Sequence, residues 1–554
     1  MSPLPPSRDW ALVDPPADLA ARYRAEGLWT DDTLGQLLDG RLREEADLAF
    51  RVWSATRPVE TTMGEVHQRA RRFAASLRAR GVGPGDVVAF WLPNCVEAAV
   101  VFWGAALLGA VVVPIVHFYG PKEVGYILAE AQPRAVVTAD RFGHVELLAG
   151  LTEVRAGDPA LELVAVVDLA GEVATQTADT VAFDDLTAPS VGPLVDAVPV
   201  DPAAPALIAY TSGTTADPKG VVHTHRSIVA EVRQLGDIQP PQPRPTLTGA
   251  PVGHAIGMLT GLLLPVYRRQ AVHLIDVWDP ARILDAMVDA DLTAGSGATY
   301  FLTSLLDAPA FGPEHLERMR WVGLGGSAVP EAVADRAIGL GISVARSYGS
   351  TEHPSTTGAP HDLPQDRRRR TDGRPLPGVE LRIVDATGAD LPAGEPGEIL
   401  SRGPDLFAGY TDPTLTATAI DADGWYHTGD VGVLDEQGWL TITDRLKDVI
   451  IRGGENISAA EVEDLVLRMP GVAEVAVVAA PDERLGEHGC AFVRVVEPSS
   501  APTLADVQAH LGAAGLARQK WPEELRIVAD LPRTPSGKVR KHELRARLRD
   551  EDRR

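Results

Sequence analysis

The chain has 554 residues, of which 45% are hydrophobic and 23% are charged, and its formal net charge is −24. This length exceeds what one hydrophobic core supports, so several domains are expected, and the acidic balance argues against non-specific binding of nucleic acid or anionic membranes. The two cysteines, Cys95 and Cys490, exclude a disulfide framework and favour a reducing cytoplasm, and residues 1–16 lack the basic-then-apolar order of a signal peptide.

Strand-like and helix-like patterns alternate from about residue 50 to residue 350, with apolar runs at residues 87–92, 135–137 and 163–167. Such alternation predicts an α/β fold with largely parallel sheets that helices cover on both faces. Residues 99–116 form an uncharged run near the lower limit for a membrane-spanning helix. Gly109 is a natural helix stop, however, and Pro114 ends a β-branched run. We therefore expect a buried helix, then a buried strand, in a soluble protein.

Residues 210–220 read Tyr-Thr-Ser-Gly-Thr-Thr-Ala-Asp-Pro-Lys-Gly. Hydroxyls, free backbone N–H groups and one lysine suit a loop that wraps phosphate oxygens. An apolar run precedes the loop and Val221 and Val222 resume a strand pattern, so we expect a hairpin tip. The kinase and GTPase pattern is not met, because Pro218 and Gly220 replace its second glycine and its hydroxyl residue. Taken alone, the composition also fits a turn that binds nothing.

Residues 348–352 read Tyr-Gly-Ser-Thr-Glu and follow the strand-like residues 342–345. An aromatic ring, hydroxyls and a carboxylate on a tight turn are suited to stacking on a base, contacting a phosphate and holding Mg²⁺. The alternative is a strand end at which Ser350 or Thr351 caps a helix. Further on, Asp430 follows a glycine turn, a place where carboxylates accept hydrogen bonds from ribose hydroxyls.

Two metal sites suggested by short motifs are rejected. Asp421 and Asp423 resemble the start of a calcium loop, but Gly432 stands where that loop needs a bidentate glutamate. His223 and His225 alternate along a strand, and no third ligand has suitable spacing.

The sequence pattern changes after residue 370, where short predicted strands such as residues 380–384 and 439–443 are separated by glycine turns. This predicts a small barrel-like β subdomain over about residues 371–444. A polar hinge follows at residues 444–448, Asp-Arg-Leu-Lys-Asp. Beyond it, a helix opened by Ser458 and a strand–strand–helix–strand pattern predict a compact α+β domain over residues 445–554.

Two loops of this C-terminal domain contain residues that are suited to binding or catalysis. Residues 452–457, Arg-Gly-Gly-Glu-Asn-Ile, form a glycine-rich turn that a solvated linker would also explain. Residues 532–541 present Lys538 on a Pro/Gly turn, where its ammonium is suited to stabilising a developing phosphate charge. An ordinary exposed lysine is the alternative.

Together, the motifs at residues 210–220, 348–352, 425–430, 444–457 and 532–541 resemble those of the acyl-adenylate-forming (AMP-binding) superfamily in identity, order and spacing. The resemblance covers about residues 25–545, and the chain looks most similar to cyclohexanecarboxylate and medium-chain carboxylate–CoA ligases. Residues 21–29 also look like the start of 2,3-dihydroxybenzoate-activating ligases. The resemblance implies a large N-terminal domain, residues 1–444, and a small mobile C-terminal domain that turns near Lys447.

The resemblance also implies a two-step reaction with ATP, Mg²⁺ and coenzyme A. A carboxylate attacks the α-phosphorus of ATP and releases pyrophosphate, and a thiol then displaces AMP from the acyl-adenylate. The implied catalytic residues are Lys538, which stabilises charge at the α-phosphate, Glu352, which binds Mg²⁺ with Thr215, and Thr351, which contacts the α-phosphate.

The same resemblance assigns binding roles to further residues. The phosphate loop contains Thr211, Ser212, Gly213, Thr214, Thr215 and Lys219, and the turns beside the nucleotide contain Gly326, Ser327, Tyr348, which stacks on adenine, and Gly349. The ribose contacts are Asp430 and Arg445, and the residues of the thiol channel are Gly453 and Gly454. The implied acyl pocket is lined by His254, Gly257, Met258, Tyr300, Gly325 and Ala328.

The pocket positions carry no lysine or arginine for a second carboxylate and no asparagine for a phenol. A compact apolar acid, either alicyclic, short-to-medium chain or simple aromatic, is therefore expected. Two alternative enzymes are a ligase that loads a carrier-protein thiol and an atypical enzyme that activates an inorganic acid such as nitrite. A third alternative is a regulator without catalysis, but the presence of both Glu352 and Lys538 argues against it. The oligomeric state is undecided, and a homodimer stays open.

Overall fold

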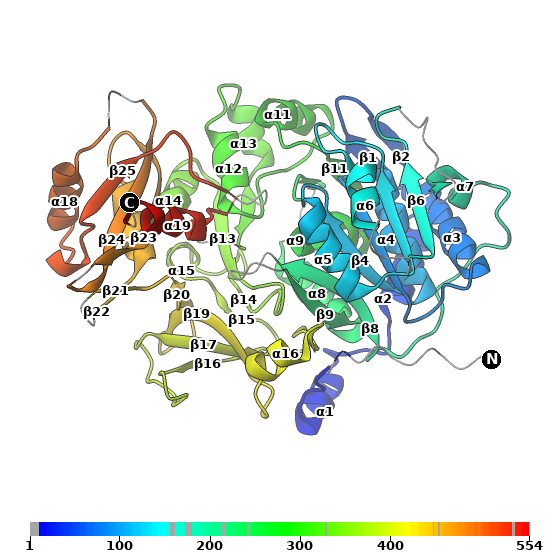
Figure 1. Ribbon diagram of the computed structural model, residues 1–554, viewed down its shortest axis with the longest axis horizontal. Coiled ribbons are helices and arrows are strands. Elements are labelled where there is room, and N and C mark those ends of the chain that lie inside the picture. The colour runs from blue at the N-terminus through cyan, green and yellow to red at the C-terminus, as the bar shows by residue number, and fades with distance from the viewer. Residues whose placement is uncertain are drawn as a thin grey trace.

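The computed structural model describes residues 10, 12–155, 161–171, 180–211, 218–240, 244–326, 329–446, 448–452, 455–482, 484–497, 499, 501–533 and 538–552. Within these ranges the chain forms five β-sheets with accompanying helices. Figure 1 shows the large sheet, with its cyan strands, and the C-terminal unit, coloured orange to red, at opposite ends of the molecule.

The largest sheet has eight strands. In spatial order they are β18 (Gly409–Tyr410), β9 (Lys219–Thr224), β8 (Pro205–Thr211), β4 (Val111–Val116), β3 (Val87–Leu92), β5 (Ala135–Ala139), β6 (Leu163–Val167) and β7 (Val181–Ala182). The six strands from β8 to β7 are parallel, whereas β9 and β18 are antiparallel to their neighbours. The predicted α/β fold with a largely parallel sheet is therefore confirmed.

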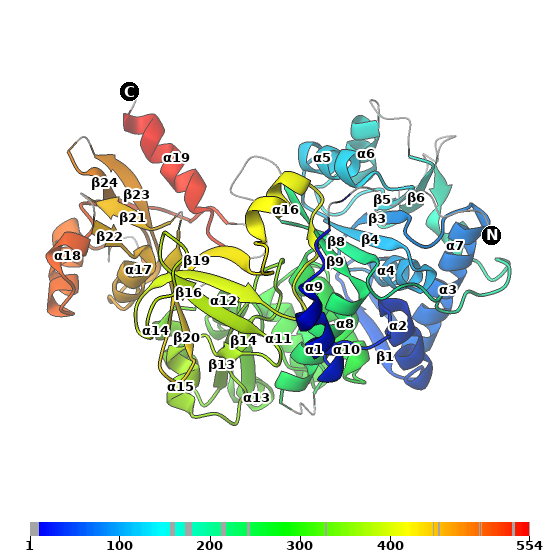
Figure 2. The ribbon, with the colours of Figure 1, turned by 90° about the horizontal axis from the view of Figure 1, so that it is seen from below.

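Helices cover both faces of this sheet. They are α2 (Leu34–Glu44), α3 (Met63–Ala79), α4 (Val96–Leu108), α5 (Pro121–Ala131), α6 (Leu147–Arg155), α7 (Phe183–Thr187) and α8 (His225–Ile238). Figure 2 shows α5 and α6 on one side and α2, α3 and α4 on the other. This double cover explains why β3, β4, β5 and β6 are buried along their whole length.

The uncharged run at residues 99–116 is a buried helix and a buried strand, as predicted. Every residue of α4 is buried, and Gly109 ends the helix at φ 72°, in the left-handed region that glycine tolerates. Within the described part of the chain, no helix is both long enough and apolar enough to cross a bilayer.

Two smaller sheets lie next to the large one in the N-terminal part of the chain. Their strands, in spatial order, are β10 (Leu247–Thr248), β11 (Val272–Ile275), β1 (Ala49–Trp53) and β2 (Val59–Thr62) in one, and β12 (Trp321–Leu324), β13 (Ser343–Tyr348), β14 (Thr357–Gly358) and β15 (Arg374–Pro375) in the other. The accompanying helices are α1 (Ala17–Ala25), α9 (Ala255–Met258), the π-helix η1 (Leu259–Leu263), α10 (Leu264–Tyr267), α11 (Pro280–Asp289), α12 (Thr299–Leu306), α13 (Pro313–Arg318), α14 (Glu331–Gly339) and α15 (Gln365–Arg370). One apolar core joins α11, α12 and α14 to β12 and β13.

The predicted β subdomain is a four-stranded antiparallel sheet. It contains β16 (Glu380–Val384), β17 (Gly397–Arg402), β19 (Tyr426–Leu434) and β20 (Leu440–Arg445), with α16 (Pro413–Ala419) in the connection before β19. Asp430 of β19 and Arg445 of β20 are register partners, so this sheet brings two predicted site residues face to face.

The C-terminal unit is an α+β sandwich with its own apolar core. Its elements are β21 (Ile450–Arg452), β22 (Glu455–Ile457), α17 (Ala459–Leu467), β23 (Val472–Asp482), β24 (Gly486–Val495), α18 (Leu504–Ala513), the 3-10 helix η3 (Arg518–Lys520), β25 (Glu524–Ile527) and α19 (Lys541–Asp552). Ser458 caps α17 by accepting a hydrogen bond from the backbone N–H of Glu461, as the spacing predicted.

Candidate active site

The predicted phosphate loop leaves the carboxyl edge of the large sheet. It joins β8 to β9, which are antiparallel with Thr211 opposite Lys219, so it is the tip of a hairpin as predicted. Figure 2 shows helix α16 beside this hairpin, and β18, which precedes α16 in the chain, pairs with β9. Ser212, Gly213, Thr214 and Thr215 lie outside the described residues. Ligands of open α/β sheets bind at this edge, beyond the carboxyl ends of parallel strands.

Tyr348, Asp430 and Arg445 form one hydrogen-bonded group. The Tyr348 hydroxyl donates to Asp430 Oδ2 at 2.7 Å, and Arg445 Nε lies 3.0 Å from Asp430 Oδ1. Burial raises the pKa of Tyr348 well above its ordinary value, and the negative charge of Asp430 acts in the same direction, so the hydroxyl stays protonated and donates. The structure therefore joins, through side chains, a predicted base-stacking residue and two predicted ribose contacts.

Thr351 and Glu352 lie on the turn that follows β13. The carbonyl of Glu352 accepts a hydrogen bond from the backbone N–H of Phe407 at 2.8 Å, and the Tyr410 hydroxyl donates to Glu352 Oε1 at 2.8 Å. The Lys219 ammonium lies 5.5 Å from the centre of the Tyr410 ring. Tyr410 thus contacts both the predicted magnesium ligand and the lysine of the phosphate loop.

Gly349 makes this turn sterically feasible. A Cβ atom at this position would lie 1.8 Å from the carbonyl oxygen of Pro354, a distance that no side chain tolerates. The turn closes through a hydrogen bond from Ser350 N–H to the carbonyl of His353. No helix starts at Ser350 or Thr351 among the described residues, so the helix-cap alternative for this motif is wrong.

Lys538 reaches the N-terminal part of the molecule from the C-terminal unit. It directly precedes Val539, which forms an antiparallel bridge with Arg533. Burial, the larger cause, and the positive charge of Lys538 together lower the pKa of His254 to about 4, so the Lys538 ammonium acts electrostatically on this imidazole. The structure thus brings together two predicted site residues that are 284 positions apart (538 minus 254).

Small residues let the backbone pack closely around the predicted acyl pocket. His254 precedes α9, and Met258 at the end of that helix is fully buried. A Cβ atom at Gly257 would lie 2.1 Å from the carbonyl oxygen of Pro251, and one at Gly325 would lie 2.5 Å from Ser347 Oγ. Gly326 has a φ of 75°, again in the left-handed region.

Aromatic and aliphatic side chains supply the apolar surface of this region. Tyr300 on α12 is 39% exposed and Ile256 on α9 is 36% exposed, which are high values for such side chains. The Trp278 and Phe301 rings pack with their centres 4.5 Å apart. The predicted residues Ser327 and Ala328 lie outside the described residues, as do Lys447, Gly453 and Gly454.

Three residues that the sequence did not suggest as site residues contact the segments of the candidate site. Tyr410 holds Glu352, and His223, noted earlier only as a rejected metal ligand, lies 2.7 Å from the Thr351 carbonyl through its Nε2. Asn94 is buried and fixes the segment before α9, since its Nδ2 donates to the carbonyl of Ala250 and its Oδ1 accepts from Val252 N–H. No sequence signal distinguishes Asn94, because its partners are backbone groups far away in the chain.

Among the described side chains, no group of three or more His, Cys, Asp or Glu is placed to hold a metal ion. His223 and His225, separated by one residue, have different partners, because His223 Nε2 lies 2.7 Å from the Thr351 carbonyl and His225 Nδ1 accepts from the backbone N–H of Leu34.

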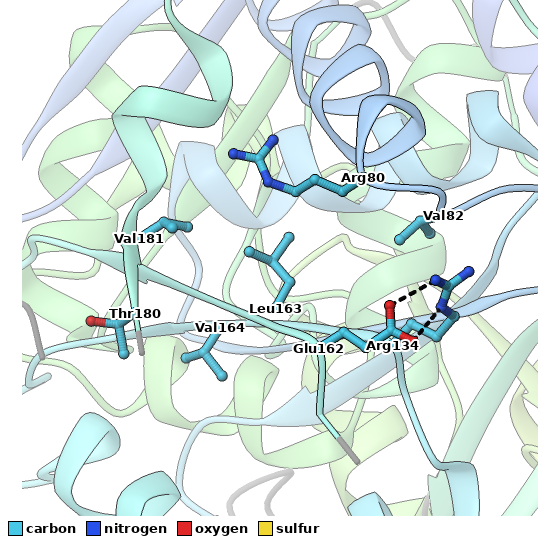
Figure 3. A pocket seen from close by; sticks show the side chains of 8 residues that line it. All are labelled: Arg80, Val82, Arg134, Glu162, Leu163, Val164, Thr180 and Val181. Carbon is cyan, nitrogen blue, oxygen red and sulfur yellow. Dashed lines mark hydrogen bonds and ion pairs between the residues drawn. The ribbon is translucent and has the colours of Figure 1, made fainter. Parts of the chain in front are cut away.

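A cavity of about 340 Å³ lies far from these residues, at the amino ends of β3, β5 and β6 (Figure 3). Arg134 is paired there with Glu162 at 2.7 Å, and Arg80 extends over the apolar floor that includes Leu163. Since the phosphate loop leaves the opposite edge of the same sheet, this cavity is not part of the candidate active site.

Comparison with known proteins identifies the family. Residues 42–411 match the family described as AMP-binding enzyme, and residues 461–538 match the AMP-binding enzyme C-terminal domain. The medium-chain fatty-acid–CoA ligase of Escherichia coli (strain K12) is 34% identical over 528 residues, which cover 95% of this chain and 92% of the relative.

A second relative, from Rhodococcus jostii (strain RHA1), is a (7a-methyl-1,5-dioxo-octahydroinden-4-yl)propanoyl:CoA ligase. It is 37% identical over 505 residues, which cover 88% of this chain and 94% of the relative. Among solved structures, ATP-bound MatB from Rhodopseudomonas palustris matches with a TM-score of 0.82 and 29% identity, covering 93% of this chain and 99% of the other. The match over both domains, together with the site geometry, shows that the chain belongs to the AMP-binding enzyme family.

Proposed function

We propose that this protein is an ATP-dependent carboxylate–CoA ligase that first adenylates a carboxylic acid and then transfers the acyl group to coenzyme A. The observation that carries the proposal is the hydrogen-bonded group of Tyr348, Asp430 and Arg445, in a chain whose two parts match AMP-binding enzymes. Lys538 of the C-terminal unit is suited to the first step, because adenylation builds up negative charge at the α-phosphate and the attacking carboxylate.

The N-terminal residues hold the nucleotide in this proposal. The loop from Thr211 to Lys219 surrounds the β- and γ-phosphates, Thr351 contacts the α-phosphate, and Tyr348 stacks on the adenine. Asp430 and Arg445 hold the ribose hydroxyls. The hydrogen bonds among Tyr348, Asp430 and Arg445 support this assignment, since they orient the three side chains before any nucleotide is bound.

Mg²⁺ fits the donor chemistry of this region. Glu352 offers a carboxylate, the ligand that Mg²⁺ prefers, and Tyr410 orients that carboxylate by donating to its Oε1. We propose Glu352 and Thr215 as the residues that would hold the ion. When bound, it would supply positive charge next to the phosphate oxygens.

The acid is a compact apolar one in this proposal. We assign Ile256, Met258 and Tyr300 to the wall of the acyl pocket, and the neighbouring segments 254–258, 299–301 and 325–326 contain no arginine or lysine to pair a second carboxylate. The relatives support this range, since one is named for a medium-chain fatty acid and another for an acid that carries a fused ring system.

The domains exchange roles between the two steps. We place the boundary at residues 444 and 445 and the pivot at Lys447, with Gly453 and Gly454 lining the thiol channel after rotation. We also place the reaction in the cytoplasm, because both cysteines are free and buried.

The direct test is pyrophosphate release across a panel of acids, measured with and without coenzyme A. We expect release with medium-chain and alicyclic monocarboxylates, and a CoA thioester of the same acid by mass spectrometry. Acid-dependent release without any CoA thioester would contradict the proposal and point to a carrier-protein thiol. Release with nitrite and with no carboxylic acid would point to an atypical acid.

An ion-pair cluster holds the C-terminal unit in its present orientation. Arg468 at the end of α17 lies 2.9 Å from Glu331 and 2.7 Å from Asp464, and the backbone N–H of Glu331 donates to Asp464 at 2.8 Å. Glu331 opens α14 in the N-terminal part, so these contacts cross between the two domains. Half-exposed ion pairs contribute about 0.2–1 kcal/mol each, which is enough to bias a balanced rotation several-fold.

Arg468→Ala is therefore expected to slow adenylation about two- to fivefold and to speed thioester formation from a supplied acyl-adenylate by a similar factor. The matched control is Arg494→Ala, which removes an ion pair of similar exposure to Glu474 within the C-terminal unit. If both variants change the two half-reactions alike, the cluster does not control the orientation.

A further inference from the structure

His223 connects two loops of the nucleotide site. It lies near the end of β9, the strand that leaves the phosphate loop, and its side chain is buried. Its Nε2 lies 2.7 Å from the carbonyl oxygen of Thr351, 128 positions away in the chain. Because a carbonyl only accepts, Nε2 carries the proton and donates it. The other nitrogen, Nδ1, lies 3.3 Å from Ser227 Oγ on α8.

The imidazole is a fixed donor rather than a titrating group at neutral pH. Burial lowers the pKa of His223 to about 4, against the raising effects of the bond to Thr351 and of the charge on Asp405. The ring is therefore neutral at pH 7, with its one N–H directed at Thr351. Burying a polar ring at this place is costly unless it is hydrogen-bonded, and its bond is made to the nucleotide loop.

Buried side chains also hold the rest of the loop that bears Thr351 and Glu352. His353 lies 2.9 Å from Ser401 Oγ and 3.2 Å from Asp405 Oδ1, and Ser355 Oγ donates to Glu231 Oε1 at 2.8 Å. These bonds fix the loop to α8, to β17 and to the segment after β17. Among these buried groups, His223 belongs to the strand that begins at Lys219, so it links the loop to the phosphate-binding hairpin itself.

We propose that His223 is a positioning residue that ties the strand of the phosphate loop to the loop bearing Thr351 and Glu352. Through this bond the two sides of the triphosphate site keep a fixed separation, so that ATP meets a preformed site. The inference rests on the proposed function, because it takes the ligand to be ATP. It assigns to an imidazole without substrate contact a role in nucleotide affinity and in the rate of adenylation.

The test contrasts two amides at position 223. The amide nitrogen of glutamine extends to about the place of Nε2, whereas that of asparagine extends only to about the place of Nδ1. His223→Gln is therefore expected to keep the bond to Thr351, and His223→Asn is expected to lose it and leave that carbonyl unpaired. We expect His223→Asn to bind ATP about tenfold more weakly by calorimetry, and His223→Gln to stay within about threefold of the wild type.

His225→Asn is the matched control, because His225 is equally buried but accepts from the backbone N–H of Leu34, away from the nucleotide loop. It is expected to lower the melting temperature without a change in ATP affinity. Equal ATP affinities of His223→Asn and His223→Gln would overturn the inference, as would equal losses in His223→Asn and His225→Asn.

Failure of the proposed function gives a different result. In that case the wild type forms no CoA thioester with any acid, while the binding measurements still report whether His223 positions the ATP site. Among folded variants, acid-dependent pyrophosphate release is expected to fall about tenfold for His223→Asn and to recover in His223→Gln.

Discussion

Lys538→Ala is expected to lower acid-dependent pyrophosphate release about 10²–10³-fold, the range seen when one group that stabilises transition-state charge is removed. Lys538 approaches His254 from the C-terminal unit, and its positive charge contributes to the low pKa of that imidazole. In the proposed mechanism this point charge acts on the charge that develops during adenylation and has no equivalent role when a thiol attacks the finished acyl-adenylate. Thioester formation from a supplied acyl-adenylate is therefore expected to stay within about threefold of the wild type.

The control for this variant is Lys520→Ala, which removes a lysine of the same domain that pairs with Glu461 on the surface. Both half-reactions of that variant are expected to match the wild type, because an exposed ion pair contributes little. If Lys538→Ala slows both half-reactions equally, Lys538 does not act in one step alone and the exchange of domain orientations is wrong.

Much of this fold could be predicted from local sequence patterns, in which the signals lie on residues close together in the chain. The helix–strand division of residues 99–116 was predicted because Gly109 and Pro114 are local signals, and the structure places α4 and β4 on either side of Gly109. The hairpin at residues 210–220 was predicted for the same reason, since strand-like residues flank a turn composition on both sides.

The contacts that hold the loops of the site in place could not be predicted from such local patterns. Tyr410 contacts Glu352 and His223 contacts Thr351 because β18, β9 and the turn after β13 meet in space. A single sequence contains no periodicity that pairs such distant positions. The local signal for His223, two histidines separated by one residue, suggested a metal site, and the structure shows that the two rings have unrelated partners.

The candidate site therefore has two kinds of parts. Residues that would touch the nucleotide lie in short motifs that are visible in sequence, either on turns, such as Thr351 and Glu352, or on strands, such as Asp430, and residues that hold these motifs come from sheet cores and neighbouring loops. Gly349 belongs to the first kind, since its turn presses against the Pro354 carbonyl, and Asn94 belongs to the second. Substitutions of the second kind are expected to change affinity and rate by factors near ten, and substitutions of the first kind by factors of hundreds.

Glu352→Gln is the second variant with a large expected effect. Glutamine keeps the size of the side chain and an oxygen that accepts from the Tyr410 hydroxyl, so the local fold should persist. What it loses is the negative charge that suits Mg²⁺. We expect pyrophosphate release to fall about 10²-fold, and the Mg²⁺ concentration needed for half-maximal rate to rise about tenfold.

Tyr410→Phe separates the charge of Glu352 from its orientation. It leaves the carboxylate intact and removes only the hydrogen bond at 2.8 Å, which as a bond to a charged group contributes about 1.5–3 kcal/mol. The rate is therefore expected to fall at least about tenfold, with a smaller shift in the Mg²⁺ requirement than Glu352→Gln produces. If Tyr410→Phe matches Glu352→Gln in both measurements, orientation rather than charge decides the role of Glu352. If Glu352→Gln leaves the Mg²⁺ requirement unchanged, the magnesium ligand is another residue, because a neutral amide oxygen binds Mg²⁺ more weakly than a carboxylate does.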